Sequence, residues 1–174
     1  KVFPMHHDSF TFVMQSVTVE ATGCYAVSNN TSLPKDNAKC QEALRKLPML
    51  KYRSSGSGVI VSNGPGVTYV VTAGHVCEAP KVPEKIKENS VVIETSVTNT
   101  ITIQLYSGAK LKSTIVAIDS ANDLCLLRLD RRVGKVTKVS HRDLDHGEKV
   151  YSLAAPYGMF SPGMVLAFEG RYSG

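Results

Sequence analysis

The sequence predicts an all-β fold built around a small antiparallel barrel, and three observations support this. The strand-like segments after Lys51 are short and are separated by turn residues, such as Asn63-Gly64-Pro65-Gly66 between two apolar runs. Residues 99–106 alternate between apolar and polar side chains, which is the pattern of a half-buried strand. Only one segment has the spacing of a helix. About six short strands with tight turns are typical of a closed or nearly closed barrel.

The first 51 residues are expected to form an N-terminal extension that contains the one helix. Residues 9–22 have the composition of a strand, and a polar loop over residues 28–35 follows it. The helix is expected over residues 34–47, because four of its residues fall at helical spacing and Pro48 stops it. These four residues are Ala38, Gln41, Leu44 and Leu47.

The first barrel is expected over residues 52–139, and each of its strands is bounded by turn or polar residues. The expected strands, in order, are 58–62, 67–72, 90–96, 99–106, 111–118 and 123–129. Between Asp130 and Glu148 the sequence becomes charged and loses any apolar period, which is typical of a connection between two units. A linker is therefore expected at residues 140–149.

New strand signals begin after this linker, at residues 150–155 and 164–168. Two or three strands do not make an independent core. Residues 150–174 are therefore expected to be the first strands of a second β-barrel. This gives four segments: an extension over 1–51, a barrel over 52–139, a linker over 140–149 and a barrel begun over 150–174.

The composition excludes several classes of function. A chain of 174 residues with 43% hydrophobic and 20% charged residues can bury a core, so disorder is not expected. The net charge of +5 is spread thinly and is not interleaved with aromatic residues, so nucleic-acid binding is not expected. No apolar run approaches the ~20 residues that cross a bilayer, so no membrane span is expected. No metal or organic cofactor is implied, and the pair His6-His7 beside Asp8 is expected to be incidental.

The four cysteines allow two disulfides without requiring either. Cys24 and Cys40 flank a polar loop that a bridge could close, and their spacing does not suit paired zinc ligands. Cys77 and Cys125 lie in apolar, strand-like surroundings. They are expected to be small buried hydrophobic residues, or to form a bridge if they approach each other.

His75 and Asp123 are the residues best placed for chemistry. His75 follows the apolar strand Val70-Val71-Thr72-Ala73-Gly74, where small residues let the chain turn and present the ring at the rim of a barrel. An imidazole, with an ordinary pKa of about 6.5, can take up and return a proton near neutral pH. Asp123 comes 48 residues later and leads directly into an apolar strand, where its carboxylate needs a donor such as an imidazole N–H. Asp123 could instead cap a turn, and Asp119 is a weaker rival because it has no strand directly behind it.

Three motifs, in order, carry a family resemblance: Ser55-Gly56-Ser57-Gly58-Val59-Ile60-Val61, Thr72-Ala73-Gly74-His75 and Asn122-Asp123-Leu124-Cys125-Leu126-Leu127. This stretch resembles the trypsin-like (chymotrypsin-fold) serine proteases, most closely the HtrA/Deg or bacterial glutamyl-endopeptidase style. The resemblance implies a double β-barrel of which the first barrel is complete here. It also implies that His75 is the general base and that Asp123 orients its ring.

The nucleophilic serine of that family lies in a Gly-x-Ser-Gly motif, and this sequence contains none. Ser57 precedes the histidine, Ser161 precedes a proline, and Ser173 follows Asp123 too closely. The resemblance therefore implies a serine endopeptidase acting on proteins or peptides, whose serine lies beyond Gly174 in the same or a separate chain. This chain alone is then expected to be inactive.

An alternative function is a protease-like module that has lost catalysis and serves as a structural or binding part of a larger assembly or virion. Retention of both His75 and Asp123 favours the protease. Family habit and a Cys24–Cys40 bridge favour a location outside the cytoplasm or secretion, with virion association as the location that the alternative implies.

Overall fold

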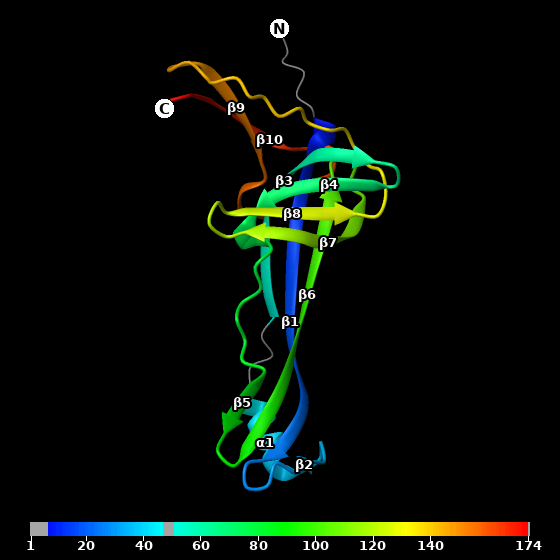
Figure 1. The fold of residues 1–174 in the computed structure, drawn as a ribbon, viewed down its shortest axis with the longest axis vertical. Coiled ribbons are helices and arrows are strands. Elements are labelled where there is room, and N and C mark those ends of the chain that lie inside the picture. Colours follow the sequence, from blue (N-terminus) through cyan, green and yellow to red (C-terminus); the bar gives the residue numbers. More distant parts are fainter. Residues whose placement is uncertain (1–6, 47–50, 174) are drawn as a thin grey trace. The chain divides into compact units, whose positions relative to one another are not determined.

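The computed structural model describes residues 7–46 and 51–173, most of which lie in β-strands (Figure 1). The helical turns and the α-helix are η1 (His7–Ser9), α1 (Ala38–Lys46), η2 (Gly74–Val76) and η3 (Pro156–Gly158). The strands are β1 (Phe10–Ala26), β2 (Ser32–Leu33), β3 (Lys51–Gly64), β4 (Val67–Ala73), β5 (Lys85–Glu88), β6 (Val91–Leu105), β7 (Lys110–Asp119), β8 (Leu124–Leu129), β9 (Lys149–Ala154) and β10 (Leu166–Arg171). The mostly β architecture that the sequence predicts is confirmed.

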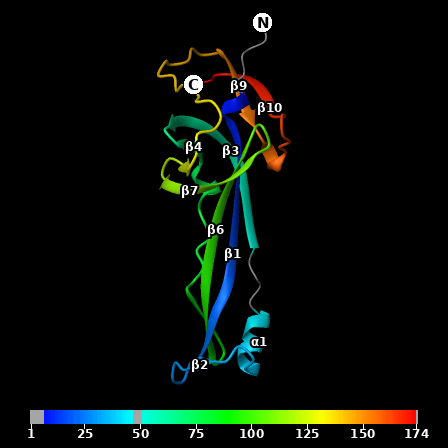
Figure 2. The ribbon, with the colours of Figure 1, turned by 90° about the vertical axis from the view of Figure 1, so that its right-hand side faces the viewer.

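Six strands close into a ring. Their order is β1-β3-β4-β8-β7-β6, and β6 pairs back to β1. The β3–β4 hairpin turns at the Asn63–Gly66 segment, where Gly66 has a φ of 71°, a value that favours glycine. Figure 1 shows β3, β4, β8 and β7 one after another in this ring, and Figure 2 shows β3, β4 and β7 from a second direction. The closed antiparallel barrel expected from the strand and turn pattern is therefore present.

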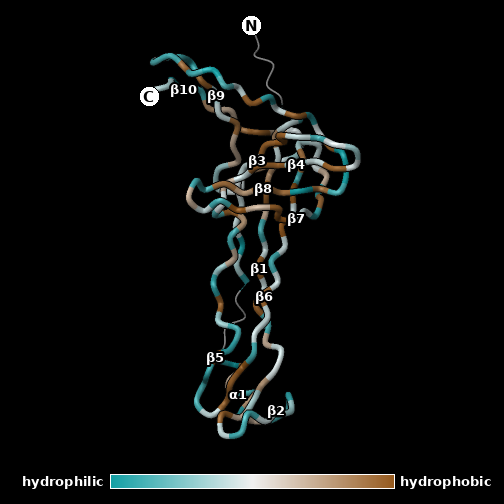
Figure 3. The backbone as a smooth tube through the Cα atoms, in the orientation of Figure 1, coloured by the Kyte–Doolittle hydropathy of each residue, from teal (hydrophilic) through white to brown (hydrophobic). Residues whose placement is uncertain are grey.

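Alternation of side chains along the strands builds the barrel core. Ile101 and Ile103 of β6 are buried, as are Val70 of β4 and Leu127 of β8, which face each other in register. The apolar colour of β8 in Figure 3 follows this pattern. Gly58 of β3 leaves no room for a side chain, because a Cβ there would lie 2.6 Å from the hydroxyl of Thr11. The close approach of β1 to β3 thus depends on this glycine.

The chain forms two compact units. Strands β1, β3 and β6 of the ring each run from one unit into the other, whereas β4, β7 and β8 belong to the first unit. The first unit comprises the chain up to Gln15, Ser54–Glu78 and the residues from Thr100 onward. The second comprises Ser16–Arg53 and Ala79–Asn99. This division differs from the four expected segments, since the start of β1 belongs with the barrel rather than with an extension over residues 1–51. The physical reason is that Val13 of β1 packs in the barrel core.

The second unit has a core of its own around the Cys24–Cys40 disulfide, with Val91 and Ile93 of β6 packed against it. Helix α1 begins at Ala38, four residues later than expected, because the side chain of Asn37 accepts hydrogen bonds from the first turn and caps it. The expected stop at Pro48 lies outside the described residues. Strand β5 was not expected, and it pairs antiparallel with β6 from Lys85↔Glu94 to Glu88↔Val91.

A separate two-stranded sheet follows the barrel strands in the sequence. Strands β9 and β10 pair antiparallel, with Ala154 opposite Leu166 and Lys149 opposite Arg171. These are the two strands expected after residue 149. Several of their apolar side chains are exposed, including Tyr151, Leu166 and Phe168. Within the parts of the chain that the structure describes, no helix has the length and apolarity needed to span a bilayer.

Candidate active site

His75 lies in the short turn η2, directly after strand β4. Strand β4 pairs with β8, and the last pair of that ladder joins Ala73 to Leu124. The contact continues one residue beyond this ladder, to Gly74 after β4 and Asp123 before β8. There the backbone amide of Gly74 donates a hydrogen bond to the Asp123 carbonyl oxygen over 2.8 Å. The register of two neighbouring barrel strands therefore brings residues 74–75 opposite residue 123.

The side chains of His75 and Asp123 meet at this point. Nδ1 of His75 lies 2.9 Å from Oδ2 and 3.1 Å from Oδ1 of Asp123. The backbone amide of His75 also donates to Oδ1 over 2.8 Å. Both side chains are solvent-exposed, by 68% for His75 and 56% for Asp123. The structure thus brings together the two residues that the sequence singles out.

The contacts of His75 keep the Asp123 carboxyl ionised. Its pKa is lowered chiefly by the hydrogen bond from the His75 backbone amide and next by the bond from the imidazole, while desolvation acts in the opposite direction. An ionised carboxylate only accepts hydrogen bonds, so the short contact requires a proton on Nδ1 of His75. In the neutral imidazole, Nε2 is then unprotonated and available as a proton acceptor.

Asp119, the rival carboxylate, is engaged within its own turn. Its oxygens accept bonds from the backbone amides of Ala121 and Asn122 and from the side chain of Asn122, the last over 2.7 Å. These bonds, with the Asn122 side chain first, lower the pKa of Asp119. Asp119 therefore shapes the loop that precedes Asp123, and Asp123 is the carboxylate that contacts His75.

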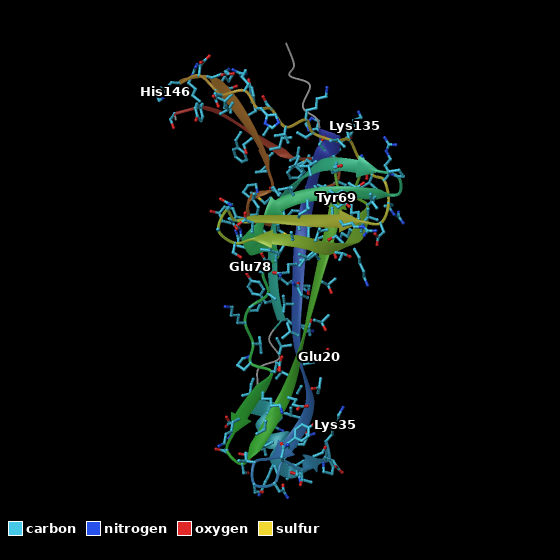
Figure 4. The ribbon with its side chains drawn as sticks, in the orientation of Figure 1. Glu20, Lys35, Tyr69, Glu78, Lys135 and His146 are labelled. Atoms are coloured by element: carbon cyan, nitrogen blue, oxygen red, sulfur yellow. A yellow bond between two sulfur atoms is a disulfide. The ribbon has the colours of Figure 1, made fainter. Side chains whose placement is uncertain are left out.

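Two further links join the segment that carries His75 to the segment that carries Asp123. A disulfide connects Cys77 to Cys125, so the option of a bridge that the sequence left open is realised. The hydroxyl of Ser120 donates to the carboxylate of Glu78 over 2.5 Å (Glu78 is labelled in Figure 4). The sequence held one signal for the disulfide, because each cysteine follows His75 or Asp123 by two residues and both pairs are 48 residues apart.

The serines that were considered as nucleophiles have other surroundings. The hydroxyl of Ser57 accepts a hydrogen bond from the backbone amide of Ala155 over 3.0 Å, which ties β3 to the residue after β9. Ser161 forms an isolated bridge with Met164 in the loop between β9 and β10. Ser173 follows β10 in an exposed, irregular segment. The hydrogen bonds of His75 described above join it to Asp123.

An apolar cavity of about 610 Å³ lies in the first unit beside this pair. It is bounded by Val59 of β3, Val71 of β4 and Leu153 of β9. Ala73 and Leu124 also line it, and they lie two residues before His75 and one residue after Asp123 in the sequence. Two of its walls are therefore barrel strands, and the third is the sheet that follows the barrel.

In the described ranges 7–46 and 51–173, no group of three or more potential ligands could hold a metal ion. His7 stacks on Tyr106 with ring centroids 5.3 Å apart. Asp8 pairs with Lys135, which is labelled in Figure 4, over 3.0 Å. His6 lies outside the described residues.

Comparison with known proteins gives one family and two relatives in the HtrA style. The serine protease Do-like HtrA of Bacillus subtilis is 30% identical over 106 residues, which cover 60% of this chain and 20% of that protein. The probable periplasmic serine protease do/HhoA-like of Haemophilus influenzae is 27% identical over 129 residues, which cover 71% of this chain and 23% of that protein. The chain thus spans about a fifth of the length of these relatives. Residues 56–174, more than half of the chain and including both His75 and Asp123, match the trypsin-like peptidase domain, so the chain belongs to that family.

Proposed function

We propose that this chain supplies the histidine and the aspartate of a Ser-His-Asp triad in a serine endopeptidase. The contact of 2.9 Å between His75 Nδ1 and Asp123 Oδ2 is the observation that carries the proposal. Membership of the trypsin-like peptidase family and the likeness to two serine proteases support it. The substrates of such an enzyme are proteins or peptides.

The bonds between the two residues support a distinct role for each. Nε2 of His75 takes the proton of the serine hydroxyl as that oxygen attacks the scissile carbonyl carbon, and the same nitrogen then gives the proton to the leaving amine. Asp123 holds the proton on Nδ1 and stabilises the imidazolium that forms in between. The reaction needs no metal or organic cofactor.

We place the nucleophilic serine outside residues 1–174. It lies either in a continuation of the same polypeptide after Gly174 or in a separate chain. Two features support this placement. The sequence contains no Gly-x-Ser-Gly motif, and the chain spans only about a fifth of its relatives. In this proposal residues 140–149 link two barrels and β9 and β10 begin the second one. Their exposed apolar residues and the adjoining cavity are surfaces that further strands would cover.

The site of action that we propose is outside the cytoplasm. Both disulfides link cysteines that are almost completely buried, and disulfides of this kind persist in oxidising compartments. The name of the relative from Haemophilus influenzae also includes the word periplasmic. Thiol alkylation of the protein taken directly from cells tests this, since both bridges are expected to be closed there.

The triad assignment is tested in the parent protein that extends past Gly174. We expect His75→Ala to abolish peptide hydrolysis and labelling by a fluorophosphonate. The control is His146→Ala, which is expected to retain both, because His146 is an exposed residue far from His75 in the sequence (Figure 4). Turnover above background in His75→Ala contradicts the assignment. A parent protein that has neither Gly-x-Ser-Gly nor Gly-x-Cys-Gly and that shows no labelling supports the inactive structural module instead.

A further inference from the structure

We propose that the Cys77–Cys125 disulfide is a positioning element for the His75–Asp123 pair, which fixes the turn that carries the histidine onto the strand that follows the aspartate. The proposal rests on the proposed function for its catalytic meaning. The two cysteines touch no reacting group, so their role is to hold the pair in its geometry.

The location of the disulfide is the first argument. The bridge lies two residues after His75 on one segment and two residues after Asp123 on the other. Segment 74–78 and segment 119–125 are also joined by the hydrogen bonds from the Gly74 and His75 amides and by the Ser120–Glu78 bond. The disulfide is the covalent member of this set of links.

The exposure of the pair is the second argument. With side-chain exposures of 68% for His75 and 56% for Asp123, most of the surface of each side chain faces solvent rather than neighbouring protein. Exposed ion pairs are weak, because both side chains are hydrated and lose rotational freedom when they pair. The geometry of the pair therefore depends on how firmly the two backbone segments are held together.

The anchoring of the disulfide is the third argument. Both cysteines are 1% exposed and belong to the core of the barrel. Cys125 lies opposite Thr72 of β4 and Ile118 of β7, so it sits in a strand that is paired on both sides. The carbonyl oxygen of Cys77 accepts a bond from the buried side chain of Gln15 over 2.9 Å. One end of the bridge is thus fixed in the sheet and the other holds the end of η2.

The second disulfide provides a matched control. Cys24–Cys40 is also buried, but it lies in the second compact unit, around a separate core. If stabilisation of the chain in general were the only role of Cys77–Cys125, loss of either bridge would affect the His75–Asp123 pair alike. A positioning role predicts an effect on the pair only from the Cys77–Cys125 bridge.

The test compares Cys77→Ala/Cys125→Ala with Cys24→Ala/Cys40→Ala in the 174-residue chain by NMR, and it needs no hydrolysis. In the first variant we expect hydrogen exchange of the Gly74 and His75 amides to become at least tenfold faster and the pKa of Asp123 to rise toward its ordinary value. The amides of Val70 and Leu127 report that the barrel remains folded. In the control variant we expect Gly74, His75 and Asp123 to behave as in the unmodified chain.

A second variant, Cys77→Ala/Cys125→Val, restores apolar volume in the core and is expected to give the same changes at the pair. Unchanged exchange at His75 together with an unchanged Asp123 pKa overturns the proposal, as do equal changes in the Cys24→Ala/Cys40→Ala control. Loss of the Val70 and Leu127 signals in both Cys77 variants also overturns it, because the bridge is then a requirement of the whole barrel.

Hydrolysis by the parent protein separates this proposal from the triad. There we expect loss of the Cys77–Cys125 bridge to lower kcat at least tenfold with little change in KM, since a displaced base impairs the chemical step more than substrate binding. If the parent protein hydrolyses no peptide but the NMR changes occur, the triad assignment fails and the positioning role stands. If hydrolysis is unaffected by loss of the bridge, the positioning role fails and the triad stands.

Discussion

The carboxylate of Asp123 contacts His75 through both the backbone and the ring. The backbone amide of His75 donates to Oδ1 over 2.8 Å, and the imidazole Nδ1 lies 2.9 Å from Oδ2. One of these donors is part of the side chain and the other is not. Substitution of His75 therefore removes only the ring's contribution, and the two contributions can be measured separately.

The pKa of Asp123 measures this double contact. Because the backbone amide is the largest cause of its lowered pKa, we expect His75→Ala to raise the pKa of Asp123 while leaving it below the ordinary aspartate value. A ¹³C NMR titration of the Asp123 carboxyl carbon in the chain measures both values. The folded pKa lies below the unfolded one, so stabilisation by this carboxylate is complete above the ordinary aspartate pKa and is lost as the pH falls through the folded value. An unshifted pKa in the unmodified chain contradicts the described contacts.

Asp123→Asn is expected to lower hydrolysis by the parent protein on the order of 10⁴-fold, because an amide N–H in place of a carboxylate oxygen favours the wrong imidazole tautomer. The measurement is kcat/KM for a peptide substrate. Asp119→Asn is the matched control, since Asp119 bonds only within its own turn in the contacts described. Equal losses in the two variants would show that the effect comes from the loop rather than from the pair.

Gly58→Ala is expected to destabilise the barrel by about 1–3 kcal/mol, the usual range for overpacking a core. A Cβ at Gly58 would lie 2.6 Å from Thr11 Oγ1 and 2.9 Å from Val13 Cγ2, so these side chains or the backbone that carries them must move. Gly170→Ala in strand β10 is the control, because its nearest neighbour would be Val150 Cγ2 at 3.9 Å. Urea unfolding gives both free energies, and equal stability of the two variants would argue against the close β1–β3 contact.

The barrel core is tested by two isoleucines on neighbouring strands. Ile103 of β6 is fully buried, whereas Ile118 of β7 is 39% exposed. We expect Ile103→Ala to lower the free energy of unfolding by about 2–5 kcal/mol and Ile118→Ala by less than about 1 kcal/mol. Thermal or urea unfolding distinguishes them. A reversed order would place β6 with its opposite face toward the core.

Local patterns in the sequence predicted most of the barrel and made His75 and Asp123 candidates, and the family resemblance of the motifs around them selected the pair. Alternation over residues 99–106, the Asn63–Gly66 turn and the strands that end near His75 and begin near Asp123 are all features of neighbouring residues. The structure contains these strands and brings the two side chains together. The role of the pair in catalysis remains a proposal.

Features that depend on contacts between distant residues were not predictable in this way. Strand β1 pairs with β3 and β6, so its place in the barrel is set by partners far along the chain. The Cys77–Cys125 bridge likewise depends on β4 and β8 being neighbours. The start of α1 was misplaced for a local reason, because Asn37 caps the first turn and the apolar spacing of the helix does not show where a cap lies.

The tautomer of the His75 ring in the 174-residue chain tests the central claim most directly. ¹⁵N NMR at neutral pH distinguishes a ring protonated at Nδ1 from one protonated at Nε2. The His75–Asp123 geometry predicts, for the neutral ring, a proton on Nδ1 and a free Nε2 that can accept the proton of a nucleophile. A neutral ring that carries its proton on Nε2 would leave His75 unable to act as the general base, and it would contradict the account.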